Sequence, residues 1–196
     1  HDLLGRFFHD LLPFNTRKIL AAFYTRPQSA EILSALAIDN YDEKVIDPAC
    51  GSGTLLVSAY RRKSMLAPRK TKSLHKQFVE NDIYGIDIMP FAVHLTGINL
   101  STQNIQMVTN YTLTAVGDSL LDISRKKLVT FPSKIHQVDT FLSQMIPLEQ
   151  KTINETDKLR VELHKFDTVI MNPPFTKKER LPKQYRQHLD LYWKEW

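Results

Sequence analysis

The sequence predicts an α/β protein built on an open, doubly wound parallel sheet with a helical N-terminal segment. Short runs of β-branched and aromatic residues alternate with stretches of helical periodicity, the order expected of strand-helix-strand units. Four of these runs end in a polar side chain, namely Asp47, Asp87, Asp118 and Asn172. Because the carboxyl ends of parallel strands meet along one edge of a sheet, we expect these four side chains to converge on a ligand crevice.

Length and composition indicate one globular domain. The 196 residues are 42% hydrophobic and 24% charged, enough for one sizeable core and a small appendage. No apolar run approaches the roughly 18 to 20 residues that span a bilayer, so we expect no membrane segment. The chain starts at His1 without a leader-like stretch, and we expect it to be an internal piece of a longer protein.

The cysteine count and net charge limit the function classes further. The single cysteine, Cys50, excludes an intramolecular disulfide and offers no metal cluster, so we expect no metal and a reducing, cytoplasmic location. The formal net charge of +5 is a mild indication of a nucleic-acid partner, because phosphates attract basic surfaces. Many proteins without such a partner carry a similar charge.

Helical patterns dominate the first forty residues. Apolar residues at helical spacing predict two short helices within residues 2–23 that pack on a larger body. A third helix is predicted over residues 28–37, with Pro27 near its first turn and Thr25 as its N-cap. As an alternative to capping, Tyr24 and Thr25 lie where they can face a ligand.

The segment from Asp47 to Thr54 predicts a tight turn between a strand and a helix. Gly51 and Gly53 permit positive φ and a close ligand approach, and the helix N-terminus presents free N–H groups. A dinucleotide-binding turn has a third glycine where Leu56 stands, which argues against a pyrophosphate ligand of that class. The carboxylate of Asp47 would repel phosphate but suit an ammonium, such as that of S-adenosylmethionine, directly or through water.

The second and third strands supply further acids at the same edge. Residues 83–87 are predicted as a strand ending in Asp87, followed by a helix that begins at Pro90. An acid at this position holds ribose hydroxyls in folds of this type. Residues 113–119 are predicted as a third strand and turn that contain Asp118. Three strands that each end in an acid are hard to explain by packing alone.

Two basic stretches and a long connection complete the pattern. Residues 61–76 are predicted as a solvated loop, with a DNA-facing patch as the alternative. The connection over residues 121–165 is predicted to hold one or two helices around residues 135–145, then a mobile segment. The second basic stretch, residues 177–186, follows the fourth strand. For this stretch, contact with phosphate and a solvated face are equally favoured.

Asn172, Pro173, Pro174 and Phe175 follow the apolar run of residues 166–171 and predict a rigid loop after a buried strand. The Asn172 side chain and the Pro173 carbonyl can accept hydrogen bonds from an amino group, and Phe175 offers a ring for stacking. A planar, amine-bearing ring such as adenine fits these groups. A lone Asn-Pro-Pro step is more often only a turn.

In their order along the chain, these segments resemble the adenine-specific DNA methyltransferases of restriction-modification and related phage-defence systems, over residues 20–176. Residues 23–27 are similar to the family's Tyr-Thr-Pro segment, with Arg26 where many members have the proline. Residues 47–54 are similar to its glycine motif, and residues 172–175 to its catalytic tetrapeptide. The resemblance implies a Rossmann-like, S-adenosylmethionine-dependent methyltransferase sheet, of which this chain carries the first four strands.

The resemblance also implies which residues act. The implied catalytic residues are Asn172, Pro173, Pro174 and Phe175. The implied cofactor-binding residues are Tyr24, Thr25, Asp47, Ala49, Gly51, Gly53, Thr54, Asp87, Ile88, Asp118, Ser119 and Asn172. Among them, Asp87 would hold the ribose of S-adenosylmethionine and Asp118 would lie near its adenine.

The implied reaction is methyl transfer from S-adenosylmethionine to the N6 amine of an adenine flipped out of double-stranded DNA. Residues 1–40 would form a helical segment with the cofactor motif, and residues 41–196 a catalytic core without its later strands and target-recognition domain. Specificity or restriction subunits, or fused domains, are the expected partners. Two alternatives remain, a methyltransferase of protein glutamine amides, which carries tyrosine in place of Phe175, and a non-catalytic cofactor-binding module.

Overall fold

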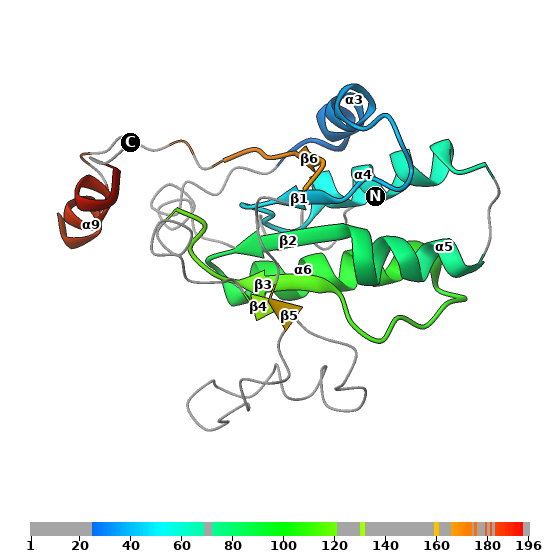
Figure 1. Cartoon of the computed structure of the whole chain (residues 1–196). Coiled ribbons are helices and arrows are strands. Elements are labelled where there is room, and N and C mark those ends of the chain that lie inside the picture. Colours follow the sequence, from blue (N-terminus) through cyan, green and yellow to red (C-terminus); the bar gives the residue numbers. More distant parts are fainter. Residues whose placement is uncertain are drawn as a thin grey trace.

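A parallel sheet forms the centre of the molecule, with strand order β3-β2-β1-β6 (Figure 1). The computed structural model describes residues 25–68, 72–120, 130–131, 159–160, 166–173, 175, 179, 181 and 183–193. The strands are β1 Val45–Asp47, β2 Ile83–Asp87, β3 Leu113–Val116 and β6 Thr168–Val169. Ile46 of β1 lies opposite Tyr84 of β2 and Val169 of β6. All four predicted strands are therefore present, and the fourth is shorter than its apolar run.

Helices pack on this sheet and connect its strands. They include α3 Pro27–Ala37, α4 Thr54–Leu66 and α6 Pro90–Ser101. Val45 packs with Leu55 of α4 in one apolar cluster, whereas Ile46 packs with Tyr84 and Leu113 in another. Successive side chains of a strand point to opposite faces, so β1 is buried on both. This burial explains why its apolar run is continuous rather than alternating.

The first basic stretch is not the solvated loop that its composition predicts. The helix α4 extends to Leu66, and α5 covers Lys72–Gln77. A π-helical turn, η1 Phe78–Asp82, then leads directly into β2. The prediction was wrong because the count of basic residues ignores the apolar residues between them, which bury one side of these helices.

Lys63 within that stretch is fully buried. Its ammonium lies 3.2 Å from Asp82 Oδ2, 5.1 Å from the centre of the Phe78 ring, and donates to the Glu43 carbonyl oxygen. Burial lowers the pKa of Lys63 and raises the pKa of Asp82, and the attraction between the two charges opposes both shifts. Asp82 precedes β2 and Glu43 precedes β1. The two contacts of Lys63 therefore join the amino ends of these strands.

The start of α3 corrects a second prediction. The N-cap is Arg26, in an extended conformation with φ −67° and ψ 135°, and no side chain caps the helix. Pro27 occupies the first helical turn as predicted, because its missing N–H would be unpaired there anyway. Thr25 is therefore not the N-cap, and its hydroxyl group is instead used by Asn172.

The helix α6 continues into a short 3-10 helix, η2 Thr102–Asn104, and three further elements complete the described chain. They are the antiparallel strands β4 Thr130–Phe131 and β5 Leu159–Arg160 and the helix α9 Lys183–Trp193. The strand pair was not predicted, because two-residue strands are too short for a periodic pattern. The helices predicted within residues 2–23 and 135–145 lie outside the described residues. None of the described helices is both long enough and apolar enough to cross a membrane.

Candidate active site at the carboxyl ends of the strands

The glycine turn between β1 and α4 lies at the carboxyl edge of the sheet. Gly51 and Gly53 have φ angles of 54° and 85°, in agreement with the sequence prediction. The Cys50 amide donates to the Ile86 carbonyl oxygen of β2 at 2.9 Å, and the Gly53 amide donates to the Cys50 carbonyl oxygen at 2.8 Å. The first bond ties the turn to the neighbouring strand, and the second closes the turn itself. The helix α4 begins directly after it, so its N-terminal amides lie at this edge.

Two polar side chains of α6 hold this turn, and sequence reasoning missed both. Thr96 Oγ1 donates to the Gly51 carbonyl oxygen at 2.8 Å, and Asn99 Nδ2 donates to the Ser52 carbonyl oxygen at 2.9 Å. A Cβ atom at Gly53 would lie 2.9 Å from side-chain atoms of Thr96, so contact and φ both require glycine there. The sequence does carry a signal for this contact, because Thr96 and Asn99 are polar residues three positions apart on the buried face of one helix.

Asp87 supports the turn from the end of β2. Its Oδ2 atom accepts a hydrogen bond from the Gly51 amide at 2.9 Å, and its Oδ1 atom accepts one from the Met89 amide at 2.9 Å. Burial raises the pKa of Asp87, and hydrogen bonds from Met89, Gly51 and Ile88 oppose that rise. Asp87 is therefore oriented before any ligand arrives, and its role toward a ribose stays a prediction.

Asp47, at the end of β1, is only 1% exposed. Its Oδ1 atom accepts a hydrogen bond from the Ala49 amide at 3.0 Å. Burial above all, with repulsion from Asp87, raises the pKa of Asp47 to about 7, although the Ala49 hydrogen bond lowers it. A carboxyl with this pKa is close to half ionised at neutral pH, and a nearby cation would favour its charged form. Its proximity to an ammonium group stays a prediction.

The residues after β3 reach the same edge. The Gly117 amide donates to the Asp87 carbonyl oxygen at 3.0 Å, continuing the pairing of β3 with β2. The Ser119 hydroxyl donates to the carbonyl oxygen of Pro48 in the glycine turn. Asp118 lies between these two contacts. The ends of the first three strands are thus joined by hydrogen bonds.

The loop after β6 completes the edge on the other side of β1. The Ile170 amide donates to the Ile46 carbonyl oxygen at 3.0 Å, which fixes the register of the loop that follows. Asn172 Nδ2 donates to Thr25 Oγ1 at 3.1 Å, so the loop is bound to the segment before α3. Phe175 is 70% exposed. Its ring is therefore accessible to an incoming planar group.

The remaining predicted site residues differ in accessibility. Ile88, directly after Asp87, is 61% exposed, whereas Thr54 at the start of α4 is buried. Ala49 contributes its amide to Asp47, as described above. Tyr24 and Pro174 lie outside the described residues.

The parallel sheet, the glycine turn and the polar strand ends define an α/β protein, and folds of this class bind their ligands at the carboxyl edge of the sheet. The Asn-Pro-Pro-Phe loop adds acceptors and an aromatic ring at that edge. The sequence profile of the N-6 DNA methylase family matches residues 1–195, and the chain belongs to this family.

Three curated proteins are similar to this chain in sequence. The adenine-specific methyltransferase BrxX of Escherichia coli is 33% identical over 105 residues, covering 48% of this chain and 9% of BrxX. The type II restriction enzyme and methyltransferase RM.BcgI of Heyndrickxia coagulans is 25% identical over 136 residues, covering 68% of this chain and 19% of the relative. PglX of Streptomyces coelicolor, also an adenine-specific methyltransferase, is 26% identical over 165 residues, covering 75% of this chain and 14% of PglX. The chain thus spans less than a fifth of the length of each relative.

Two solved structures are also similar. One is a modification subunit of a type I restriction enzyme from Vibrio vulnificus, with a TM-score of 0.44 and 22% identity over 63% of this chain and 25% of that one. The other is a DrdV–DNA complex, with a TM-score of 0.46 and 15% identity over 62% of this chain and 13% of that one.

Proposed function

We propose that this chain is the catalytic core of a methyltransferase that moves a methyl group from S-adenosylmethionine to the N6 amine of an adenine flipped out of double-stranded DNA. Membership of the N-6 DNA methylase family supports the reaction class. The observation that carries the proposal is the hydrogen bond from Asn172 Nδ2 to Thr25 Oγ1. With its nitrogen engaged by Thr25, the carboxamide of Asn172 keeps its oxygen as the acceptor for an incoming amine.

Asn172, Pro173 and Phe175 would bind the target base. The Asn172 side-chain oxygen and the Pro173 carbonyl oxygen accept the two amine hydrogens, while the exposed Phe175 ring stacks on the purine. These contacts orient the amine nitrogen and raise its nucleophilicity, so positioning supplies most of the catalysis. No side chain is needed as a base, because the methylated amine is acidic enough to lose its proton after transfer.

The other strand ends fit S-adenosylmethionine better than a ligand with a pyrophosphate. The carboxylate of Asp87 already accepts hydrogen bonds from three backbone amides, and its remaining acceptor capacity suits a ribose hydroxyl. The exposed side chain of Ile88 suits a purine ring, and Asp47 would repel phosphate. When bound, S-adenosylmethionine supplies a methyl group that its sulfonium makes electrophilic. The residues of this chain hold the amine in line with it.

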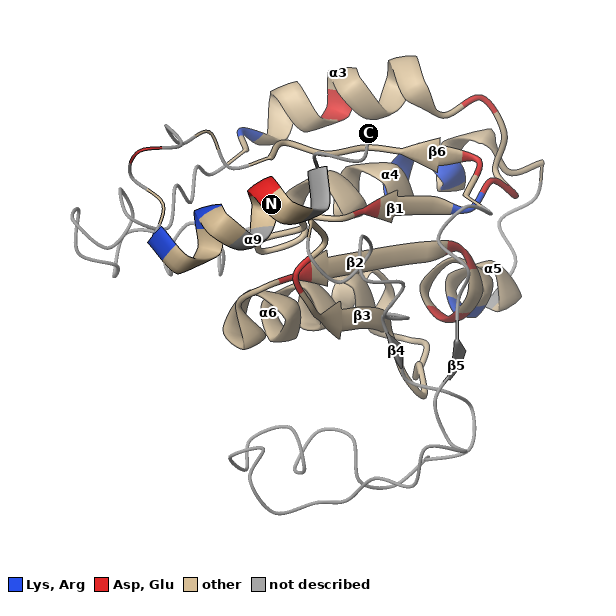
Figure 2. Ribbon diagram, turned by 60° about the vertical axis from the view of Figure 1, so that its left-hand side comes forward, with Lys and Arg blue, Asp and Glu red and all other residues tan. Residues whose placement is uncertain are grey.

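The helix α9 extends the proposal to the DNA backbone. It carries Lys183 and Arg186, and basic positions are visible along it in Figure 2. The helix follows the catalytic loop, so these side chains suit phosphates next to a flipped base. The plain alternative is a solvated helix face, and removal of either charge would distinguish them by the salt dependence of DNA binding.

For the whole protein, the relatives suggest the biological setting. Their names refer to adenine-specific methyltransferases and to a combined restriction enzyme and methyltransferase. We place this protein in the modification part of a restriction-modification or related defence system, with specificity or restriction subunits or fused domains as partners. Phe175 and the DNA methylase profile argue against a glutamine-amide methyltransferase.

The test uses the full-length protein with tritiated S-adenosylmethionine and adenine-containing DNA. Asn172→Ala should leave the affinity for S-adenosylhomocysteine nearly unchanged while methyl transfer falls at least ~100-fold, as expected on losing a preorganised hydrogen bond. Thr25→Val removes only the hydroxyl and should cause a smaller loss in the same direction. Asn40→Ala, at an exposed position before β1, is the matched control and should keep full activity. Full methylation by Asn172→Ala would contradict its role, and no transfer by the unmodified protein would contradict the reaction.

A further inference from the structure

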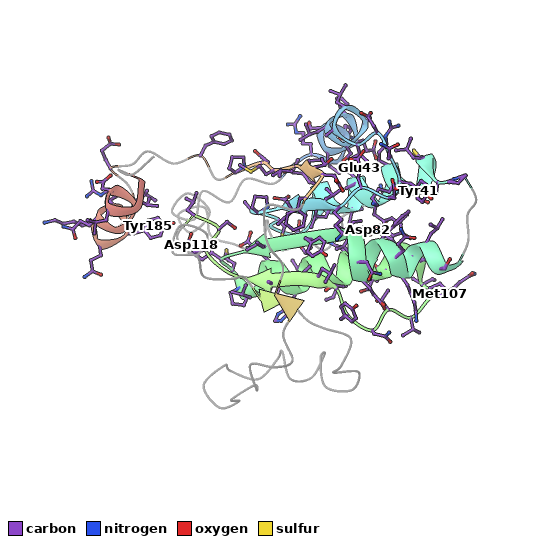
Figure 3. All side chains as sticks on the ribbon, viewed as in Figure 1. Tyr41, Glu43, Asp82, Met107, Asp118 and Tyr185 are labelled. Atoms are coloured by element: carbon purple, nitrogen blue, oxygen red, sulfur yellow. The ribbon has the colours of Figure 1, made fainter. Side chains whose placement is uncertain are left out.

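A hydrogen bond connects α9 to the end of β3. The hydroxyl of Tyr185 on α9 bonds to the carboxylate of Asp118, and Figure 3 shows the two residues close together. Burial first, and then the hydrogen bond and negative charge of Asp118, raise the pKa of Tyr185 to about 12. A phenol with this pKa stays protonated throughout the physiological range, so Tyr185 is a permanent donor to Asp118.

The position of Asp118 gives this contact its significance. Asp118 follows β3 by two residues and directly precedes Ser119, whose hydroxyl donates to the Pro48 carbonyl oxygen in the glycine turn. Its Oδ1 atom also accepts a hydrogen bond from the Leu120 amide at 2.9 Å. The carboxylate is therefore held from its own loop by an amide and from a distant helix by a phenol. A short loop side chain restrained from two directions has one preferred orientation.

We propose that Tyr185 is a positioning residue of the cofactor site, which orients the Asp118 carboxylate to accept a hydrogen bond from the 6-amino group of the bound cofactor's adenine. This inference rests on the proposed function and on the family resemblance, which implies that the adenine of the cofactor lies near Asp118.

The position of Tyr185 in the chain also connects the Asn-Pro-Pro-Phe loop with Asp118. Tyr185 lies ten residues after Phe175, so the polypeptide that leaves the catalytic loop returns to the cofactor side of the sheet. Contacts are thus made at the first residue of the tetrapeptide, by Asn172 with Thr25, and after the tetrapeptide, by Tyr185 with Asp118. An occupied cofactor site would stabilise α9 through Asp118, and α9 would in turn hold the loop that receives the target base.

The experiment compares two ligands that differ only at the base. S-adenosylhomocysteine carries the 6-amino group. S-inosylhomocysteine carries an oxygen in its place, and this oxygen cannot donate a hydrogen bond to a carboxylate. Calorimetric titration of the full-length protein would measure both dissociation constants for the unmodified protein, Tyr185→Phe, Asp118→Asn and the double variant. Tyr41→Phe, a half-buried tyrosine that precedes β1 at the opposite end of the sheet, is the matched control.

Tyr185→Phe should weaken S-adenosylhomocysteine binding about 3- to 10-fold, part of the value of a hydrogen bond to a charged group. It should change S-inosylhomocysteine binding less than about twofold and have no further effect in the Asp118→Asn background, because Tyr185 acts through Asp118. Tyr41→Phe should change neither constant.

An equal loss for both ligands would overturn the inference, since it would mean that Tyr185 only stabilises the fold. Tighter S-adenosylhomocysteine binding would also overturn it, because the phenol would then compete with the amine for Asp118. Unchanged binding of both ligands would show that the hydrogen bond has no role at this site. If the unmodified protein bound neither ligand, the proposed function would fail together with this inference.

Discussion

Replacing Asp47 with asparagine should make the protein more stable above neutral pH and weaken its binding of the cofactor. Asp47 is 1% exposed, and its pKa is raised from 3.8 to about 7, mainly by burial. Below pH 3.8 the carboxyl is protonated in both the native and unfolded states, so it contributes no pH dependence. Between 3.8 and about 7 the native state binds more protons than the unfolded state, so its stability falls as the pH rises.

The size of this effect follows from the two pKa values. Each unit of difference corresponds to 1.36 kcal/mol, so at pH 8 the ionised carboxylate destabilises the native state by up to about 4 kcal/mol. Asparagine has nearly the same shape, and its oxygen can still accept the hydrogen bond from the Ala49 amide. The variant should therefore lose the destabilisation without losing the contact that orients the glycine turn.

Urea unfolding followed by circular dichroism at about pH 5 and about pH 8 would measure the effect. The gain in stability of Asp47→Asn over the unmodified protein should be larger at the higher pH. Calorimetry should show weaker binding of S-adenosylhomocysteine by the variant, because the ammonium of the ligand loses a negative neighbour. Equal stability of the two proteins at both pH values would refute the raised pKa. Unchanged ligand affinity would refute the predicted ammonium contact.

Three further predictions concern the turn, the ribose and the buried lysine. Gly53→Ala should destabilise the protein by about 1 to 3 kcal/mol more than Gly51→Ala in urea unfolding, because only the former places a Cβ atom against α6; equal losses would show that φ alone decides. Asp87→Ala should weaken S-adenosylhomocysteine binding by about 1.5 to 3 kcal/mol in calorimetry, and an unchanged dissociation constant would place the ribose elsewhere. Lys63→Met should cost about 3 to 5 kcal/mol of unfolding free energy, because it leaves Asp82 buried without its cation. Adding Asp82→Asn should recover most of that loss, and no recovery would disprove the pairing.

The strands, the glycine turn and the helix starts at Pro27 and Pro90 could be predicted from the sequence. Each depends on residues within a few positions of one another, such as a β-branched run that ends at an acid or a proline in a first helical turn. The convergence of Asp47 and Asp87 also followed, because parallel strands place their carboxyl ends at one edge.

Both wrong predictions left out a partner that lies outside the segment concerned. Thr25 and the basic stretch at residues 61–76 were interpreted from their immediate neighbours, as a helix cap and as a solvated loop. In the structure Thr25 accepts a hydrogen bond from Asn172, and Lys63 pairs with Asp82. Asn172 is far from Thr25 in the sequence. Asp82 is separated from Lys63 by α5 and most of η1. Local pattern alone therefore could not identify either partner.

The sequence by itself determined the order of strands and helices, the sites where glycine is needed and the polar groups at each strand end. Only the tertiary structure decided which groups meet, including Thr96 and Asn99 on the glycine turn and Tyr185 on Asp118. Local conformation depends on short-range sterics and periodicity, which a sequence displays directly. A hydrogen bond between distant segments depends on how helices pack across the sheet, and the packing that brings Tyr185 to Asp118 leaves no periodic trace in the sequence.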